Sequence, residues 1–152
     1  MDFEISKMSI EDLKSIKDIL SSNFDNFWSY DVLEDELECD NSYVIVAKNS
    51  ENIIVGFAGL KVILDEANIM NIVVKKDFRH NGIGSILLEN LINYSKNINL
   101  KTITLEVNEN NLSAIRLYDK FSFDIKSSLK KGTCITISIP RESTAEPEGS
   151  IL

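Results

Sequence analysis

A short basic segment with two glycines constrains this chain more than any other feature of its sequence. The segment reads RHNGIG at residues 79–84, between the apolar, β-branched run at 69–74 and a helix-like pattern. At the start of a helix the first backbone N–H groups lack an intrahelical acceptor and can bind an anion. Gly82 and Gly84 have no Cβ, so a ligand can approach the main chain closely, and Arg79 adds a fixed charge suited to phosphate. The pattern therefore predicts a strand–turn–helix unit that cradles a pyrophosphate.

A second motif strengthens this interpretation, because glycines at a helix start also occur in ordinary turns. It reads LEVNENNLSAIRLY at residues 105–118 and ends in KFSF at 120–123. Together with the R-x-x-G-x-G turn, it resembles the GNAT superfamily of acyl-CoA N-acyltransferases. Within the superfamily the chain is most similar to the RimI branch, whose members acetylate the N-terminal alanine of a small-subunit ribosomal protein. The resemblance extends to about Pro140 and is strongest between Ile72 and Phe123.

The resemblance implies an α/β fold, the GNAT acyl-CoA N-acyltransferase fold. In that fold a mixed central sheet is splayed between its middle strands, and helices cover both faces. We expect one such domain over residues 1–140 and a polar, disordered tail over residues 141–152. Hydrophobic periodicity places strands at 3–6, 43–48, 53–61, 69–74, 102–107, 123–126 and 134–139, and helices after Ser9, at 30–38, from Ile83 and from Leu112.

Local signals define the first two helices. Ser9 is expected to cap the first helix, with Asp12 returning a hydrogen bond in a loose capping box. In the second helix, Val32, Leu33 and Leu37 are expected to face inward. Both helices would then bury one apolar side against the sheet.

The resemblance also implies a cosubstrate, acetyl-CoA, and the residues that bind it. The pantetheine arm would pair with the main chain of one strand, and the phosphates would occupy the glycine turn. On the helix after the second motif, three positions fall on one stripe at i, i+3 and i+7, and the small middle residue leaves room for a narrow ligand. The expected cofactor-binding residues are Ile72, Val73 and Val74 in the strand, Arg79, His80, Asn81, Gly82, Ile83, Gly84 and Ser85 in the turn, and Asn111, Ala114 and Tyr118 on the helix.

Acetyl transfer to an amine needs a neutral nucleophile and a proton for the leaving thiolate, and two residues are candidates for these roles. Alternation in the strand at 102–107 sets Glu106 apart from the apolar face, and the resemblance implies that it is the general base. A glutamate near a strand end is also often simply solvated. The resemblance implies that Tyr118 is the general acid, and the alternative is a buried tyrosine hydrogen-bonded to the backbone. The single histidine, His80, lies in the phosphate turn, where phosphate contact or plain exposure explains it better than catalysis.

Charge is distributed unevenly along the chain. The net charge is −8, and residues 1–70 carry 15 acidic and 5 basic side chains, whereas residues 71–152 carry 9 acidic and 11 basic ones. This acidic balance argues against nucleic-acid binding, which needs a basic surface. A basic cofactor half and an acidic remainder suit an anionic cofactor and a cationic acceptor. With the resemblance, they point to a peptide or protein N-terminus, that of a basic ribosomal protein above all.

The cysteines, the lengths of the apolar runs and the N-terminal residues bear on the cellular compartment and on metal binding. Cys39 and Cys134 lie far apart without ligand-like spacing, and a zinc site is not expected with a single histidine. No apolar run approaches the length of a bilayer span, and the N-terminus lacks the pattern of a signal peptide. We therefore expect a cytoplasmic protein with no metal and no membrane partner.

The chain departs from the family pattern at three places. Ser122 replaces the glycine that usually precedes the last phenylalanine, Asn108 stands where the RimI branch often has arginine, and the segment 127–133 is short and lacks a tyrosine. These departures leave the acyltransferase interpretation intact and weaken the ribosomal-protein assignment. The alternatives are a GNAT enzyme for a small-molecule amine or a protein lysine side chain, and a non-catalytic acyl-CoA-binding module.

Overall fold

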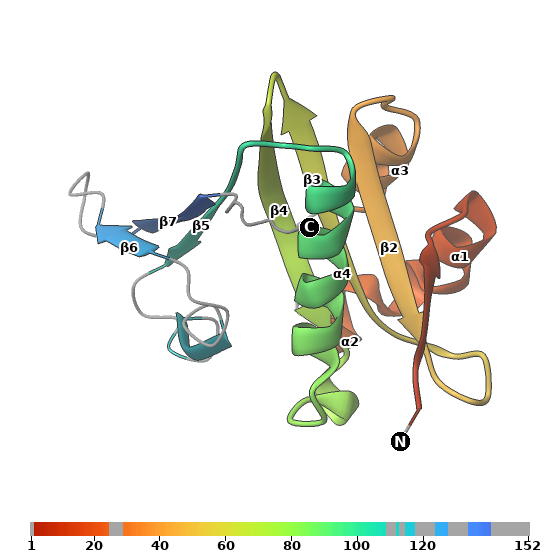
Figure 1. Ribbon diagram of the computed structural model, residues 1–152. Coiled ribbons are helices and arrows are strands. Elements are labelled where there is room, and N and C mark those ends of the chain that lie inside the picture. The colour runs from red at the N-terminus through yellow and green to blue at the C-terminus, as the bar shows by residue number, and fades with distance from the viewer. Residues whose placement is uncertain are drawn as a thin grey trace. The chain divides into compact units, whose positions relative to one another are not determined.

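A computed structural model describes residues 2–24, 29–108, 112, 115–117, 124–127 and 134–140 (Figure 1). The chain divides into two compact units, Met1–Val62 with Ile69–Leu91 and Ile63–Asn68 with Ile92–Leu152. The strand end and glycine turn predicted to bind the cofactor lie in the first unit, whereas Glu106 lies in the second. The predicted splay of the middle strands and the predicted domain limits stay predictions.

The first unit is built on neighbouring strands in the order β1-β2-β3-β4. β1 and β2 are antiparallel, with Ile5 opposite Ala47, and β2 and β3 are antiparallel, with Val46 opposite Phe57. The register shifts between Ala47 and Lys48, which makes the pairing irregular near the end of β2. The strands are β1 (Glu4–Lys7), β2 (Ser42–Lys48), β3 (Ile54–Ile63) and β4 (Glu66–Val74). All four lie at or near the predicted positions.

Short N-terminal helices cover one face of these strands. They are α1 (Ile10–Ser15), α2 (Leu20–Asn23) and α3 (Tyr30–Leu37), with a 3₁₀ turn, η1 (Lys17–Ile19), between the first two. The predicted capping box is confirmed, because the amide of Asp12 donates to Ser9 Oγ and the amide of Ser9 donates to Asp12 Oδ2, each at 3.0 Å. Lys48 Nζ lies 2.9 Å from Asp12 Oδ1, which ties α1 to β2.

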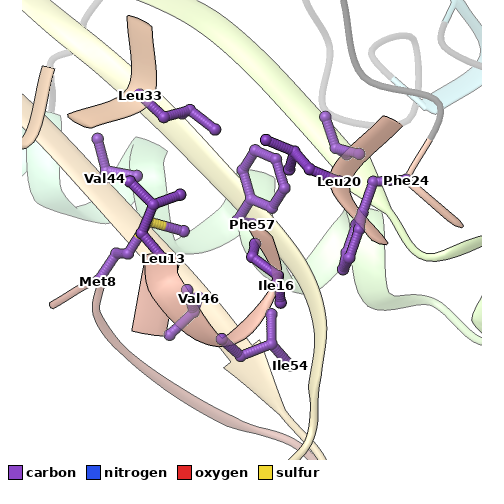
Figure 2. Close-up of a cluster of buried hydrophobic side chains, with 11 residues drawn as sticks. Met8, Leu13, Ile16, Leu20, Phe24, Leu33, Val44, Val46, Ile54 and Phe57 are labelled. Atoms are coloured by element: carbon purple, nitrogen blue, oxygen red, sulfur yellow. The ribbon is translucent and has the colours of Figure 1, made fainter. Parts of the chain in front are cut away.

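The helices and strands enclose a hydrophobic core (Figure 2). Phe24 and Phe57 are its largest fully buried side chains, with their ring centroids 5.5 Å apart. The prediction that Val32 faces inward is wrong, since its side chain is 42% exposed while Leu33 is fully buried. Successive residues of a helix point about 100° apart, so Leu33 and Leu37 face the core and Val32 does not. The cluster comprises Met8, Leu13, Ile16, Leu20, Phe24, Leu33, Val44, Val46, Ile54, Phe57 and Val73.

A single long helix, α4 (Ile83–Asn97), covers the other face of β3 in the first unit (Figure 1). The sequence pattern predicts a stripe of Ile83, Ile86, Leu87 and Leu91 on this helix. Ile83, Leu87 and Leu91 are buried and Ile86 is half-buried. Ile45 and Ala47 alternate with the core residues of β2, so their side chains belong to this second face. Helices therefore cover both faces of the first unit's sheet, in agreement with the predicted α/β fold.

The described residues of the second unit form the strands β5, β7 and β6, which are neighbours in that order. β7 pairs antiparallel with both neighbours, and Glu106 lies opposite Thr136 in the β5–β7 pair. The tip before β4 belongs to this unit, where the amide of Lys101 donates to the Asp65 carbonyl at 2.7 Å. The strands are β5 (Thr102–Asn108), β6 (Asp124–Ser127) and β7 (Cys134–Pro140), and the predicted C-terminal hairpin is confirmed.

The predicted helix between β5 and β6 is only partly described. Leu112 and residues 115–117 are helical. The sequence pattern predicts an apolar stripe of Leu112, Ile115 and Phe121 on this helix. Leu112 is 59% exposed, so its place on a buried stripe is wrong, while Ile115 is half-buried and Phe121 lies outside the described residues. Residues 141–152, the expected tail, lie outside the described residues.

Candidate functional site

The candidate site is the connection between β4 and α4. After β4 ends at Val74, the chain makes a 3₁₀ turn, η2 (Lys76–Phe78), and then reaches the glycine turn. The amide of Lys75 donates to the Val55 carbonyl of β3 at 2.8 Å, and the amide of Phe78 donates back to the Lys75 carbonyl at 2.8 Å. These bonds fix the direction in which the chain leaves the sheet.

Arg79 anchors the turn to the strand before it. Its Nε donates to the Val74 carbonyl at 3.1 Å, although the side chain as a whole is exposed. A guanidinium carries five N–H donors, so this bond leaves others for an anion. The predicted charge is therefore held at a defined place, close to the end of β4.

The side chain of Asn81 stabilises the turn internally. Its Nδ2 donates to the Phe78 carbonyl at 3.0 Å and to the Arg79 carbonyl at 3.3 Å. Both acceptors lie earlier in the turn, so the amide group closes the loop on itself. The side chain is thus engaged within the turn, and a contribution of Asn81 to ligand binding would come through its backbone.

Two residues of the turn have left-handed backbone conformations. The φ angle is +68° at His80 and +80° at Gly82, and both residues are exposed. Apart from adjacent residues, no described heavy atom lies within 4 Å of the position that a Cβ on Gly82 would occupy. The φ of Gly82 favours glycine, because a residue with a side chain would be strained there, and the space beside it is open. This open, solvent-facing side is the predicted place of a phosphate group.

The helix α4 begins at this open side. The amide of Ile86 donates to the Gly82 carbonyl at 3.1 Å, so Gly82 is the residue before the first turn. Ile83 is buried and holds the helix start on the sheet, while Gly84 and Ser85 are half-buried. A helix of 15 residues carries partial positive charge at this end, which attracts an anion.

The surroundings of the turn are also basic. Lys75, Lys76 and Arg79 carry three positive charges within five residues, against one negative charge on Asp77. The three ion pairs of the described side chains lie at other places, between Lys48 and Asp12, Lys61 and Glu36, and Lys101 and Asp65. The two lysines were not among the predicted site residues, although their position next to the phosphate turn is a signal that the sequence contains.

The predicted pantetheine-binding strand lies at the end of β4. Val73 is buried and points into the hydrophobic core, and Ile72 and Val74 are half-buried. The described groups at this end of the first unit fit an acyl-CoA, because they combine a strand end, an open left-handed turn, a helix start and basic side chains.

The catalytic candidates are only partly within the described chain. The backbone of Glu106 lies in β5, and its side chain lies outside what the structure describes. Asn111, Ala114 and Tyr118 also lie outside the described residues. Their predicted roles stay predictions.

Two classes of site receive no support from the described chain. No group of three or more His, Cys, Asp or Glu side chains is placed to hold a metal ion among the residues described. No helix in that part of the chain combines the length and the apolar character that crossing a bilayer requires.

Comparisons with known proteins agree with this geometry. The model of the acetyltransferase (GNAT) family matches residues 13–123. A [ribosomal protein bS18]-alanine N-acetyltransferase from Salmonella typhimurium is 37% identical over 82 residues, which cover 54% of this chain and 55% of that protein. The chain thus matches about half the length of this relative.

Solved structures extend the similarity to nearly the whole chain. The crystal structure of the ribosomal-protein-S18-alanine N-acetyltransferase from Escherichia coli has a TM-score of 0.80 and 25% identity, and covers 98% of this chain and 100% of that one. The Arabidopsis thaliana protein NAA60 in complex with acetyl-CoA has a TM-score of 0.78 and 17% identity, and covers 91% of this chain and 98% of that one. The second likeness concerns the fold alone.

Proposed function

This chain is an acetyltransferase of the GNAT family, and we propose that it transfers the acetyl group of acetyl-CoA directly to the N-terminal amine of a protein. The proposed acceptor is the N-terminal alanine of ribosomal protein bS18, in the cytoplasm. The names of the Salmonella and Escherichia coli proteins support this acceptor. The observation that carries the proposal is the basic, left-handed turn at Arg79–Gly82 that opens onto the start of α4.

The proposed binding mode follows from the groups around the turn. The first amides of α4 and the charge of Arg79 would hold the pyrophosphate, and the open side of Gly82 would admit it. The main chain of Ile72–Val74 would align the pantetheine arm. Bound in this way, acetyl-CoA supplies a thioester whose carbonyl carbon accepts the amine. Asn111, Ala114 and Tyr118 are also expected to bind the cofactor, but Glu106 is not, so substitution of Glu106 should separate catalysis from binding.

The chemistry of the acceptor favours an α-amine. An N-terminal amine has a pKa of about 8 and a lysine side chain one of about 10.4, so at neutral pH the uncharged form is about 250-fold more abundant for the α-amine. Only the uncharged amine attacks the thioester. Deprotonation of an N-terminal amine therefore costs less free energy at neutral pH than deprotonation of a lysine side chain. A general base would remove the remaining proton, and we assign this role to Glu106, where such help typically gives a 10²–10⁴-fold rate increase.

The leaving thiolate needs a proton, and we assign its delivery to Tyr118. A phenol has a pKa of about 10 and a thiol one of about 8.5, so the transfer requires that the site stabilise the phenolate. The attack forms the new C–N bond and breaks the C–S bond, with the amine proton passing to Glu106 and the phenol proton to sulfur. No covalent acyl-enzyme is involved in this proposal.

Surface charge supports a cationic acceptor. Asp31 and Asp35 on α3 and Glu38 directly after it are exposed, and residues 1–70 as a whole carry 15 acidic against 5 basic side chains. Such a surface attracts a basic polypeptide and raises its encounter rate. A ribosomal protein with a basic N-terminal region matches this charge.

A peptide panel tests the proposal. Purified protein and acetyl-CoA are incubated with a basic peptide that begins with alanine, with the same peptide blocked at its N-terminus but carrying a lysine, and with a polyamine. Mass spectrometry of the products should show acetyl on the first peptide only. Acetylation of only the blocked peptide or only the polyamine would assign the enzyme to lysines or to small amines. Acetyl-CoA binding without acetylation of any acceptor would favour a non-catalytic binding module.

A further inference from the structure

Gly56 of β3 lies where three parts of the first unit meet. A Cβ at this position would lie 3.0 Å from the Val73 carbonyl oxygen, 3.1 Å from Ile83 Cγ2 and 3.2 Å from Leu87 Cδ1. A Cβ in ordinary van der Waals contact lies 3.4–4 Å from its neighbours, so all three approaches are tighter than most real Cβ contacts. Gly56 therefore lets α4 lie closer to the sheet than any other residue would permit.

We propose that Gly56 is a positioning residue for the acyl-CoA-binding turn, an inference that rests on the proposed function. The atoms it faces belong to both sides of the predicted cofactor site. Val73 is in the strand assigned to the pantetheine arm, and Ile83 is the first residue of the helix whose amides are assigned to the pyrophosphate. The missing side chain at 56 sets the spacing between these two groups.

The neighbouring backbone makes this position hard to relax. The Val55 carbonyl accepts from the amide of Lys75 at 2.8 Å, and the Val74 carbonyl accepts from Arg79 Nε at 3.1 Å. A carbonyl held in a strand cannot rotate away as the end of a flexible side chain can. Because a packed interior transmits strain, an added methyl group at 56 would be accommodated mainly by outward movement of the first turn of α4 by a few tenths of an ångström.

Gly59 provides a matched control in the same strand. A Cβ there would meet Val44 Cγ2 at 3.4 Å, Met70 Cε at 3.6 Å and the Tyr43 carbonyl at 3.7 Å, which are ordinary contacts. Val44 belongs to the hydrophobic core on the face covered by α1–α3, so Gly59 faces away from α4. The change from glycine to alanine is chemically identical at both sites, and only its neighbours differ.

The experiment compares Gly56→Ala with Gly59→Ala. Acetyl-CoA and CoA binding are measured by calorimetry, with the melting temperature of each variant in the absence of ligand. We expect Gly56→Ala to weaken both ligands by about ten-fold and to raise the KM for acetyl-CoA more than it lowers kcat, since a small displacement acts on a site built to fixed spacing. Gly59→Ala should bind both ligands as the wild type does. A Gly56→Ala protein that melts at a lower temperature but binds with unchanged affinity would reduce Gly56 to a structural residue and overturn the proposal.

Two further comparisons keep the outcome decisive. If Gly56→Ala does not fold, the double variant Gly56→Ala, Leu87→Ala gives the new methyl group room on the helix side and is compared with Leu87→Ala alone. Weaker binding by the double variant supports the proposal, because the contacts with Val73 and Ile83 remain, and equal binding overturns it. If the wild type itself fails to bind acetyl-CoA, the proposed function is wrong. If the wild type and the variant bind acetyl-CoA equally well, only the proposal for Gly56 is wrong.

Discussion

The Nε atom of Arg79 donates a hydrogen bond of 3.1 Å to the carbonyl oxygen of Val74. One side chain thus connects the turn assigned to the pyrophosphate with the strand end assigned to the pantetheine arm. Arg79 is therefore expected to have two roles: its charge attracts the ligand's phosphates, and its hydrogen bond to Val74 stabilises the turn.

Substitution of Arg79 separates these two roles. Arg79→Gln removes the charge, and we expect acetyl-CoA affinity to fall by about 10–100-fold, since hydrogen bonds to charged groups contribute about 1.5–3 kcal/mol. Arg79→Lys keeps the charge but loses the planar guanidinium that can bind Val74 and a phosphate together. Its acetyl-CoA affinity should therefore lie between those of the wild type and Arg79→Gln. Calorimetric titration measures both. Wild-type affinity in Arg79→Gln would remove this residue from the cofactor site.

Gly84→Asp should change stability and binding in opposite directions. Gly84 is the second residue of α4, where an acidic side chain interacts favourably with the helix dipole by about 0.3–1 kcal/mol and where replacing glycine reduces the entropy cost of folding. The same negative charge would face the pyrophosphate, and acetyl-CoA affinity should fall by more than roughly ten-fold.

Gly84→Ala is the control for this substitution. It should share the gain in stability, because alanine also favours the helix, and lose less affinity, because it adds no charge. Urea unfolding and acetyl-CoA titration on both variants provide the comparison. If Gly84→Asp were to bind acetyl-CoA as tightly as Gly84→Ala does, the ligand's phosphates would not lie at this helix start.

The capping box of α1 predicts a loss of stability in acid. Burial tends to raise the pKa of Asp12, but hydrogen bonds from Ser9 and Lys48 and the charge of Lys48 outweigh it, so the pKa lies below the ordinary value of 3.8. A group with a lowered pKa in the folded state contributes stability above its unfolded pKa and loses it as the pH falls through the folded value.

Asp12→Asn should reveal this contribution. At neutral pH the variant should be less stable than the wild type by about 0.5–1 kcal/mol, from the lost ion pair and the weaker cap. The difference should shrink as the pH falls below 3.8, because the wild-type carboxyl then becomes neutral too. Urea unfolding between pH 7 and pH 3 measures it, and a difference that stayed constant over this range would contradict the assignment.

The sequence predicts well what depends on neighbouring residues in the chain. The Ser9–Asp12 capping box, the strand–turn–helix around Gly82 and the buried stripe of α4 all follow from spacing and local backbone preferences, and all are confirmed.

The sequence predicts less well what depends on tertiary neighbours. Val32 is as apolar as Leu33, and only the direction of α3 relative to the sheet decides that Leu33 is buried and Val32 exposed. The importance of Gly56 could not be read from the strand pattern, because the crowding comes from Val73 and from α4. The reach of Arg79 back to Val74 likewise depends on the folded path of the turn.

The two catalytic candidates are distinguished by the pH dependence of turnover. Glu106→Gln removes the base, so turnover should fall by about 10²-fold or more near neutral pH, and the loss should shrink as the pH rises through the acceptor's pKa of about 8. Tyr118→Phe should also slow turnover, but higher pH should not restore it, since the thiolate still lacks a donor. Acetyl-CoA affinity should change little in Glu106→Gln. Near-normal turnover of Glu106→Gln at neutral pH would exclude Glu106 as the base.

The acetylation state of ribosomal protein bS18 in cells tests the central claim most directly. Intact-mass and N-terminal peptide mass spectrometry would compare the parent strain, a strain from which the gene for this chain is deleted, and the deletion strain complemented with wild type or with Glu106→Gln. The account predicts that the N-terminal alanine loses its acetyl group on deletion, regains it with the wild-type gene and stays unmodified with Glu106→Gln. Full acetylation of this alanine in the deletion strain would contradict the proposed function.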